Sequence, residues 1–240
     1  MIIGNGLIAR ALKSSSLNDN KLVLFASGVS NSLCEDEAEF KRESLLLTEI
    51  ISQNSDAYKF VYFSTCSVHD ESQKLSPYVI HKLRMEKEII KLPGGLVVRL
   101  PQVVGHSNNP HTLTNYFFNC IKNDKFLKIY KNAQRNLIDI DDIVKLLKCI
   151  IDSKWVGHTL NIANPNNSYP LDIVREFESI LQKRAQYDLI DKGSWLKLDT
   201  SLVETFAPIC GVNFGEGYLE QLLSKYYAHG LKINSKENPQ

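Results

Sequence analysis

The segments KFVYFSTCSVHD (residues 59–70) and SPYVIHK (residues 76–82) together indicate how this chain folds. The first is typical of a buried strand that ends in hydroxyl side chains, and the second of the start of a helix. Tyr78 and Lys82 are four residues apart, so they share one face of that helix. A nearby ammonium group lowers the pKa of a phenol, which lets Tyr78 donate or accept a proton, while Thr65 would hold the same substrate oxygen. This arrangement predicts an alcohol or sugar oxidoreductase, provided that a hydride carrier binds nearby.

The composition limits the classes of protein to consider. The chain has 240 residues, 43% hydrophobic and 23% charged, which is enough for one large domain or a domain with a small second lobe. Its net charge is +1 and it has no block of basic residues, so nucleic acid is not expected as a partner. No apolar run approaches the roughly 20 residues that cross a membrane, and the first residues lack the features of a secretion signal. The five cysteines show no CxxC spacing, which favours reduced thiols in a cytoplasmic protein and no metal site.

A glycine-rich turn follows the first apolar residues. The sequence MII (residues 1–3) is typical of a short strand, and GNGLIA (residues 4–9) has the spacing GxGxxA at the expected start of a helix. Small residues at these positions allow a tight turn and the close approach of a pyrophosphate. We therefore expect a dinucleotide cofactor to bind at Gly4, Asn5, Gly6, Leu7, Ile8, Ala9 and Arg10.

Apolar strands alternate with helical patterns through the rest of the chain. Strands are expected near residues 21–26, 59–63, 96–100, 128–130, 136–138 and 158–162. Helices are expected near 37–53, from 77, and near 112–122, 141–151, 170–184 and 218–227, with a short helix after 199–201 and a loop over 101–110. This alternation predicts an α/β protein with a doubly wound parallel sheet covered on both faces.

The same pattern predicts two lobes. Residues 1–105 with about 136–162 should form a Rossmann-type dinucleotide-binding domain. Residues from about 106–135 with 163–232 should form a small mixed α/β lobe for the substrate. The polar tail 233–240 is expected to be disordered.

With these residues in place, the chain resembles an extended short-chain dehydrogenase/reductase of the NAD-dependent epimerase/dehydratase family, whose members act on nucleotide sugars. The resemblance covers nearly the whole chain and rests on several motifs in the family's order. These are Gly4-x-Gly6-x-x-Ala9, Phe25-Ala26-Ser27-Gly28, Thr65, Tyr78-x-x-x-Lys82, the segments 99–105 and 135–143, and Leu198-Asp199-Thr200-Ser201. In character the chain is most similar to the dTDP-4-keto-6-deoxy-sugar 4-ketoreductases.

The resemblance implies a role for each matching residue. Thr65, Tyr78 and Lys82 would be catalytic. Besides the glycine turn, the cofactor would contact Ala26, Ser27, Gly28, Tyr78, Lys82 and Pro101. The sugar nucleotide would contact Cys66, Ser67, His69, Gln102, His111, Asn115 and Arg135, with the Arg135 guanidinium on the diphosphate. The family also implies a homodimer through the helix at 37–53 and the helix that begins at Tyr78. By analogy, it implies a place in bacterial surface-polysaccharide (O-antigen) precursor synthesis.

Other readings apply to some of these residues. Arg99 on its strand is expected to serve an internal ion pair, and His81 is expected to face away from Tyr78 and Lys82. His69 fits a pocket wall better than a base, and Arg135 also fits an ordinary surface arginine.

The chain departs from the family's pattern between the glycine turn and Tyr78, where it is much shorter. A strand–helix–strand block near the adenosine site is missing, and with it the acidic residue that holds the ribose hydroxyls about 20 residues after the glycines. Asp19 has the nearest spacing but precedes its strand and is a poor substitute. Arg10 or Lys21 could meet a 2′-phosphate, so the sequence favours NADP(H) over NAD(H).

A second departure concerns the residues after Thr65. In the related 4,6-dehydratases an acidic pair follows this threonine, whereas here it is followed by Cys66 and Ser67, which are poor acids and bases for the elimination of water. Reduction of a 4-keto-6-deoxy sugar is therefore the leading hypothesis. The alternatives are a sugar 4-epimerase with tightly bound NAD, and a non-catalytic protein that senses NAD(P).

Overall fold

The computed structural model describes residues 1–17, 19 and 21–228, so the tail expected at 233–240 lies outside the described residues. The chain forms two compact units, each built from separate segments. The first unit contains Met1–Pro101, Ile140–Ala163 and Lys197–Val212, and the second contains Gln102–Asp139, Asn164–Leu196 and the chain from Asn213. Residues 197–212, which the sequence pattern assigned to the substrate lobe, thus group with the first unit.

The first unit is built on a parallel sheet with the order β1-β2-β3-β4-β8. Its strands are β1 (Ile2–Ile3), β2 (Leu22–Phe25), β3 (Lys59–Thr65), β4 (Gly95–Leu100) and β8 (Thr159–Asn161), and every neighbouring pair is parallel. The predicted α/β fold with a parallel sheet is confirmed. In this order β1 is an edge strand, at the side where a complete dinucleotide fold would continue with two further strands.

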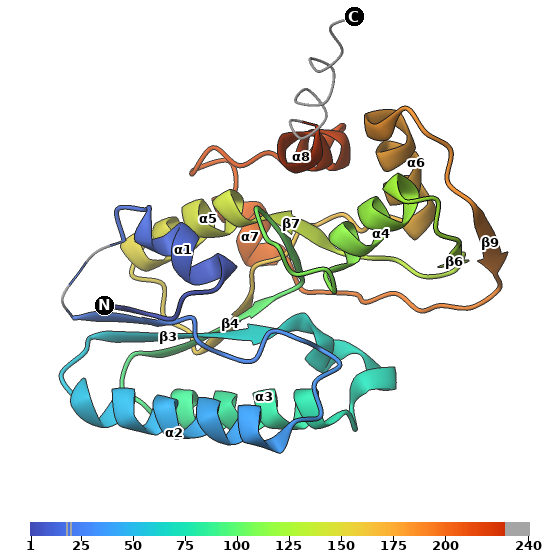
Figure 1. Ribbon diagram of the computed structural model, residues 1–240. Helices are drawn as coiled ribbons and strands as arrows, with labels where there is room; N and C mark the ends of the chain where they lie inside the picture. The colour runs from blue at the N-terminus through green and yellow to red at the C-terminus, as the bar shows by residue number, and fades with distance from the viewer. Residues whose placement is uncertain (18, 20, 229–240) are drawn as a thin grey trace, which may run out of the picture. The chain divides into compact units, whose positions relative to one another are not determined.

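Helices cover both faces of this sheet (Figure 1). The helices α2 (Glu37–Gln53) and α3 (Pro77–Ile90) lie on one face, and α1 (Leu7–Lys13) and α5 (Ile140–Asp152) lie on the other. The core under α2 and α3 is formed by alternate residues of three strands together with residues of the two helices: Val23, Phe25, Phe60, Tyr62, Val97, Leu47, Ile50, Met85 and Ile89. This alternation is what a strand with a helix layer on each face requires.

The start of α3 fixes the position of Tyr78. Ser76 caps the helix, since its hydroxyl accepts a hydrogen bond from the Val79 backbone N–H, and Pro77 occupies the first turn. The buried face of α3 then contains Tyr78, Val79, His81, Lys82, Met85, Glu86 and Ile89. Tyr78 and Lys82 therefore both lie on the covered side of the helix, as their spacing predicts.

The second unit contains the two-stranded sheets β5 (Gln102–Val104) with β7 (Leu137–Asp139) and β6 (Leu127–Tyr130) with β9 (Tyr187–Ile190). It also contains α4 (Leu113–Lys122), α6 (Pro170–Leu181) and α8 (Tyr218–Tyr227), whereas α7 (Ser201–Phe206) belongs to the first unit. The core of the second unit includes Phe117, Ile121, Leu127, Ile129, Ile173, Phe177, Leu223 and Tyr227. The sequence patterns missed β5 and β9. Both are short, and each is held by pairing with a strand that is distant in sequence.

In the part of the chain that the structure describes, no helix is both long and apolar enough to cross a membrane.

Candidate functional site

Thr65 and Tyr78 come together where β3 ends and α3 begins. Thr65 is the last residue of β3, and the 3₁₀ turn η1 (Cys66–His69) follows it directly. The Oγ1 of Thr65 accepts a hydrogen bond from the Ser67 backbone N–H at 3.1 Å and donates to the Ser67 Oγ at 3.0 Å. The hydroxyl of Tyr78 is hydrogen-bonded to Thr65. The strand end and the helix start thus place two hydroxyl groups side by side.

The phenol of Tyr78 is held neutral. Burial raises its pKa to about 12, the interaction with the Thr65 hydroxyl opposes this rise, and the Glu43 carboxylate adds to it. From the sequence we expect Lys82 to lower the pKa of Tyr78. In the structure the net shift is upward because burial is the largest effect, and the Lys82 ammonium group is paired with the Glu43 carboxylate.

Lys82 is enclosed next to Tyr78. Only 2% of Lys82 is exposed, and its Nζ lies 5.8 Å from the centre of the Tyr78 ring. The Nζ donates hydrogen bonds to Glu43 Oε1 and to the Tyr62 hydroxyl, each at 3.1 Å. Burial lowers the pKa of Lys82, and the charge and hydrogen bond of Glu43 oppose that lowering.

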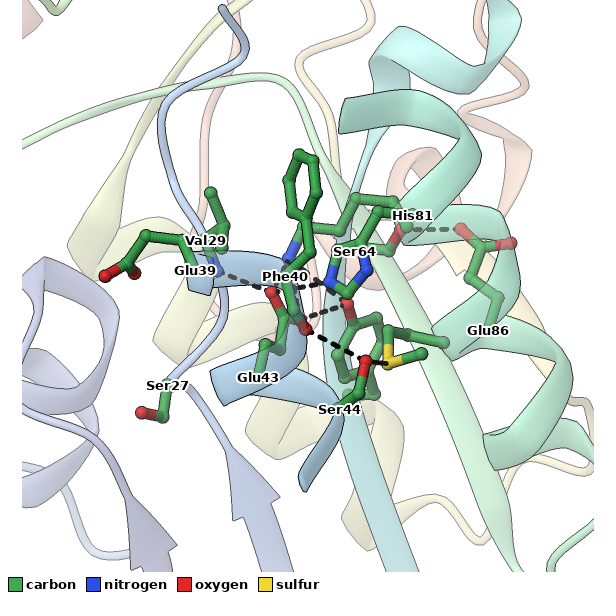
Figure 2. Close-up of polar contacts among 12 residues, drawn as sticks. Ser27, Val29, Glu39, Phe40, Glu43, Ser44, Ser64, His81 and Glu86 are labelled. Atoms are coloured by element: carbon green, nitrogen blue, oxygen red, sulfur yellow. Dashed lines mark hydrogen bonds and ion pairs between the residues drawn. The ribbon is translucent and has the colours of Figure 1, made fainter. Parts of the chain in front are cut away.

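Glu43 of α2 lies at the centre of these contacts (Figure 2). Its Oε2 accepts the Val29 backbone N–H at 2.6 Å, and its Oε1 accepts the Tyr62 hydroxyl at 2.5 Å. Burial alone would raise the pKa of Glu43, but hydrogen bonds and the charge of Lys82 outweigh burial and hold it at about 2. The carboxylate is therefore ionised at any physiological pH.

Sequence reasoning missed Glu43, although the sequence contains a signal for it. Phe40, Glu43, Leu47 and Ile50 recur at helical spacing, and all but Glu43 are apolar. A charged residue within an apolar stripe predicts a buried partner of opposite charge. The prediction for His81 is also corrected, because this residue faces the same carboxylate. Its ring stacks on Phe40, and its Nε2 lies 3.1 Å from Glu43 Oε2.

A second buried ion pair supports the ends of β3 and β4. The Arg99 Nη2 lies 2.6 Å from Glu86 Oε2, which confirms the internal ion pair expected for Arg99. Glu86 also accepts a hydrogen bond from the Ser64 hydroxyl at 2.6 Å, so this hydroxyl already has a partner within the protein. His69 Nε2 lies 3.4 Å from Arg99 Nη1 and 3.3 Å from the Asn161 Oδ1.

Cys66 follows Thr65 and is 2% exposed. Burial raises the pKa of its thiol to about 12, with a smaller opposing effect from the charge of Arg99. The thiol therefore stays protonated near neutral pH, which makes it a poor acid or base. Ser67 is engaged with Thr65 as described above, and its side chain is half-buried.

The glycine turn after β1 is crowded at Gly4 and open at Gly6. Gly4 has a φ of 121°, and a Cβ on it would lie 2.3 Å from the Ala26 carbonyl oxygen, so the turns after β1 and β2 touch. A Cβ on Gly6 would meet no atom within 4 Å, so this side of the turn is open. Arg10 Nη1 donates to the Asn5 carbonyl at 3.1 Å, and Lys13 Nζ donates to the Gly4 carbonyl at 2.8 Å. Leu7 and Ile8 are half-buried in α1 and Ala9 is fully buried.

The loop after β2 lies over the Lys82–Glu43 pair. A Cβ on Gly28 would lie 2.5 Å from Lys82 Nζ and 2.9 Å from Glu43 Oε1, so a side chain there would have to displace the end of one of these two residues. The neighbouring Ser27 carbonyl accepts a hydrogen bond from Arg42 Nη2 at 3.3 Å, and Ala26 is the residue touched by Gly4.

These residues fit one half of a nicotinamide dinucleotide better than the other. The open glycine turn, the loop at Gly28 and the hydroxyls of Thr65 and Tyr78 suit the pyrophosphate and nicotinamide half. The acidic residue that holds the adenosine ribose has no equivalent after β2, where the chain continues as Ala26-Ser27-Gly28. Asp19 cannot replace it, because its carbonyl lies 3.2 Å from the Met1 amino group, at the opposite ends of the strands.

Four predicted substrate residues belong to the second unit. Gln102 and His111 are exposed, and Arg135 is half-buried with its Nη1 donating to the Gln134 carbonyl at 2.9 Å. The amide of Asn115 is used within the unit, because it donates to the carbonyls of Ser107 and Asn109 and accepts from the Tyr227 hydroxyl at 2.6 Å. Pro101 is the half-buried residue that ends the first segment of the first unit.

Across residues 1–17, 19 and 21–228, no group of three or more His, Cys, Asp or Glu side chains is placed to hold a metal ion.

The profile of the NAD dependent epimerase/dehydratase family matches residues 23–163. The chain therefore belongs to this family of NAD-dependent enzymes. The match begins within β2, so it does not include the glycine turn. A search of curated proteins with the sequence found no significant match.

The fold is similar to that of several solved enzymes of sugar-nucleotide metabolism. The UDP-glucuronic acid 4-epimerase of Bacillus cereus, solved with UDP-glucuronic acid and NAD, has a TM-score of 0.66 and 19% identity, with 95% of this chain and 79% of that chain covered. The dTDP-glucose 4,6-dehydratase of Bacillus anthracis, solved with NAD, has a TM-score of 0.66 and 16% identity, covering 90% and 73%. The UDP-N-acetylglucosamine 4-epimerase of Methanobrevibacter ruminantium has a TM-score of 0.67 and 17% identity, covering 93% and 82%. At these identities the likeness shows the fold alone.

Proposed function

We propose that this protein reduces a nucleotide-linked 4-keto-6-deoxy sugar to the 4-hydroxy sugar with a nicotinamide cofactor. The observation that carries this proposal is the state of Tyr78, which is a neutral phenol hydrogen-bonded to Thr65. A neutral phenol is a proton donor, and the reduction of a ketone needs a proton donor at the carbonyl oxygen.

The residues of the site have separate tasks in this proposal. When bound, the reduced dinucleotide supplies a hydride for the ketone carbon. Tyr78 donates its proton to the ketone oxygen, which completes the alcohol, and solvent later returns a proton to the phenolate. Thr65 hydrogen-bonds the same oxygen and orients it. The charge of Lys82 favours the phenolate that is left on Tyr78, because that anion forms only during the reaction.

The residues after Thr65 argue against a dehydratase. Elimination of water needs an acid and a base near neutral pH, and burial raises the pKa of the Cys66 thiol to about 12. A sugar 4-epimerase is the second candidate, and its support is that several of the similar solved structures are 4-epimerases. An epimerase must first remove a proton from an alcohol, for which a neutral Tyr78 is the wrong starting form.

For the cofactor we propose NADP(H), although the similar structures cited above with a dinucleotide contain NAD. The support is the basic character of the glycine turn, where Arg10 and Lys13 both donate to its backbone carbonyls. The missing acidic residue also removes the usual partner of a free ribose hydroxyl. For the substrate we propose a dTDP-linked sugar whose diphosphate is bound by Arg135, in a protein that functions as a homodimer.

The test is a titration of the purified protein with NADPH and NADH, with and without a dTDP-4-keto-6-deoxy sugar. Oxidation of the cofactor that depends on the sugar would support the reductase and identify the dinucleotide. Activity without added reductant, in a protein that retains NAD on purification, would support the epimerase. No binding of either dinucleotide would contradict both enzymatic proposals and favour a non-catalytic role.

A further inference from the structure

We infer that Glu43 is a positioning residue that keeps Lys82 charged inside the protein and holds its ammonium group beside Tyr78. This inference rests on the proposed function for its catalytic meaning. The pairing of Glu43 with Lys82 involves protein side chains only and does not depend on that function.

The carboxylate of Glu43 is held on several sides. It accepts a hydrogen bond from the loop at Val29, one from Tyr62 on β3 and one from Lys82 on α3, and it lies beside His81 of the same helix (Figure 2). Glu43 is 0% exposed. A carboxylate with this many partners is fixed in position, so it can fix the lysine in turn.

Lys82 needs this partner because of its burial. An ammonium group taken out of water loses a large hydration energy, and in practice a buried lysine without a counter-ion releases its proton. The Lys82 ammonium group donates to Glu43 Oε1 and to the Tyr62 hydroxyl at 3.1 Å, and to Glu43 Oε2 at 3.4 Å. The pair thus provides a charged group whose position is set before any ligand binds.

Other charged groups are too distant or already paired to replace Glu43. The titratable and charged groups that act on Lys82 or on its partner are Glu43 and Arg42 of α2, Tyr62 of β3, and Tyr78, His81 and Glu86 of α3. Of the two acids, Glu86 forms its ion pair with Arg99. Among the acids of the described residues, Glu43 is the one that forms an ion pair with the Lys82 ammonium group.

The position of Gly28 places the pair at the cofactor loop. The loop passes so close that a methyl group at Gly28 would overlap both Lys82 Nζ and Glu43 Oε1. The pair therefore packs directly against the loop at Gly28, which is expected to lie beside the nicotinamide ribose.

The direct test observes the ammonium group of Lys82 by NMR in protein labelled with nitrogen-15 lysine, without dinucleotide or sugar. The wild-type protein should give a slowly exchanging ammonium signal above neutral pH, identified by its absence in Lys82→Met. In Glu43→Gln this signal should disappear as pH rises, whereas in Glu49→Gln, an exposed site on the same helix, it should persist. An unchanged Lys82 signal in Glu43→Gln would overturn the inference.

The second test uses turnover and its dependence on pH. Glu43→Gln should lose kcat on the order of a hundredfold, because a misplaced catalytic group has an effect of that size, and its activity should fall at a lower alkaline pH than that of the wild type. Glu43→Asp retains the charge and should restore most of the pH profile even if its rate is reduced. A uniform loss in Glu43→Gln without a change in the profile would indicate a purely structural role and contradict the inference.

Folding and function are separated by two further measurements. If Glu43→Gln does not fold, the double variant Glu43→Gln/Lys82→Met should fold better, since it leaves no buried charge unpaired; a double variant no more stable than Glu43→Gln would contradict the pairing. If no sugar nucleotide is turned over but the NMR result is as expected, the proposed function fails and the charged pair stands.

Discussion

The Nζ of Lys82 lies 3.1 Å from the Oε1 of Glu43, and neither residue is more than 2% exposed. The two residues belong to α3 and α2, which lie on the same face of the sheet (Figure 1). The ion pair therefore ties these helices together next to Tyr78. A pair buried in this way does more for geometry than for stability, because the loss of hydration offsets much of the attraction between the charges.

Replacement of Tyr78 by phenylalanine should abolish turnover but leave binding. The variant loses the proton donor, so we expect kcat to fall by roughly a thousandfold, with sugar-nucleotide affinity little changed. Tyr130→Phe, at an exposed site on β6, is the matched control and should retain full activity. Steady-state kinetics and calorimetric binding measure the two effects, and normal turnover by Tyr78→Phe would contradict its catalytic role.

The two glycines of the first turn should respond differently to alanine. Gly4→Ala introduces a Cβ that lies 2.3 Å from a backbone oxygen, at a φ of 121°, so we expect a loss of about 2 kcal/mol or more in the free energy of unfolding. Gly6→Ala meets open space and should unfold at nearly the wild-type temperature. It should instead weaken dinucleotide binding, because its methyl group would occupy the space of the pyrophosphate. Thermal unfolding and cofactor titration distinguish the two variants, and a destabilised Gly6→Ala would contradict this account.

Gly28→Ala should displace Lys82. The added methyl group needs space that the lysine and Glu43 occupy, and forced overpacking costs typically about 1 to 3 kcal/mol. We expect a lower unfolding temperature together with a reduced kcat. Lys82→Met shortens the side chain that obstructs the new methyl group. In the Lys82→Met protein, Gly28→Ala should therefore lower the free energy of unfolding by less than it does in the wild type. Additive losses in the double variant would show that the two residues do not interact.

The free energy of unfolding should decrease at acidic pH, and this decrease should depend on Glu43. Its pKa is about 2 in the folded protein and 4.5 in the absence of perturbation. Because the folded value is the lower one, the ionised form stabilises the fold at pH values above 4.5, and this contribution is lost as pH falls from 4.5 towards about 2. The shift corresponds to about 3 kcal/mol as an order of magnitude. Urea unfolding across this range should show the decrease, and Glu43→Gln should flatten it while Glu49→Gln should not.

Removal of one partner from the Glu86–Arg99 pair should destabilise the fold without altering the pH profile of turnover. The Glu86 carboxylate is 2% exposed and also accepts the Ser64 hydroxyl. Glu86→Gln should lower the free energy of unfolding by about 3 kcal/mol, because Arg99 loses its counter-ion. A double-mutant cycle with Arg99→Met measures the coupling, and a coupling near zero would contradict the role of this pair.

The sequence predicted the regular elements of the first unit well because their physical signals are local. The helix at 37–53 has the bounds that its apolar periodicity predicted, and the cap at Ser76 fixes α3 where the Tyr78–Lys82 spacing needed it. The same is true of the helix at 218–227 in the second unit, whose bounds are also those predicted. The short strands β5 and β9 were missed, since what makes them strands is a partner far along the chain. The site was only partly predictable for the same reason. Spacing places Tyr78 and Lys82 on one helical face, but the effect of Lys82 on Tyr78 depends on Glu43, which approaches from another helix.

The edge position of β1 has a kinetic consequence. A dinucleotide that is held mainly at its nicotinamide and pyrophosphate end would leave the protein readily, because its adenosine end adds little to the barrier for release. We then expect a short residence time, with each catalytic cycle drawing a fresh reduced molecule from the surrounding pool. The rate of such an enzyme follows the ratio of reduced to oxidised nicotinamide around it, so the supply of reducing equivalents would set the flux through the reaction.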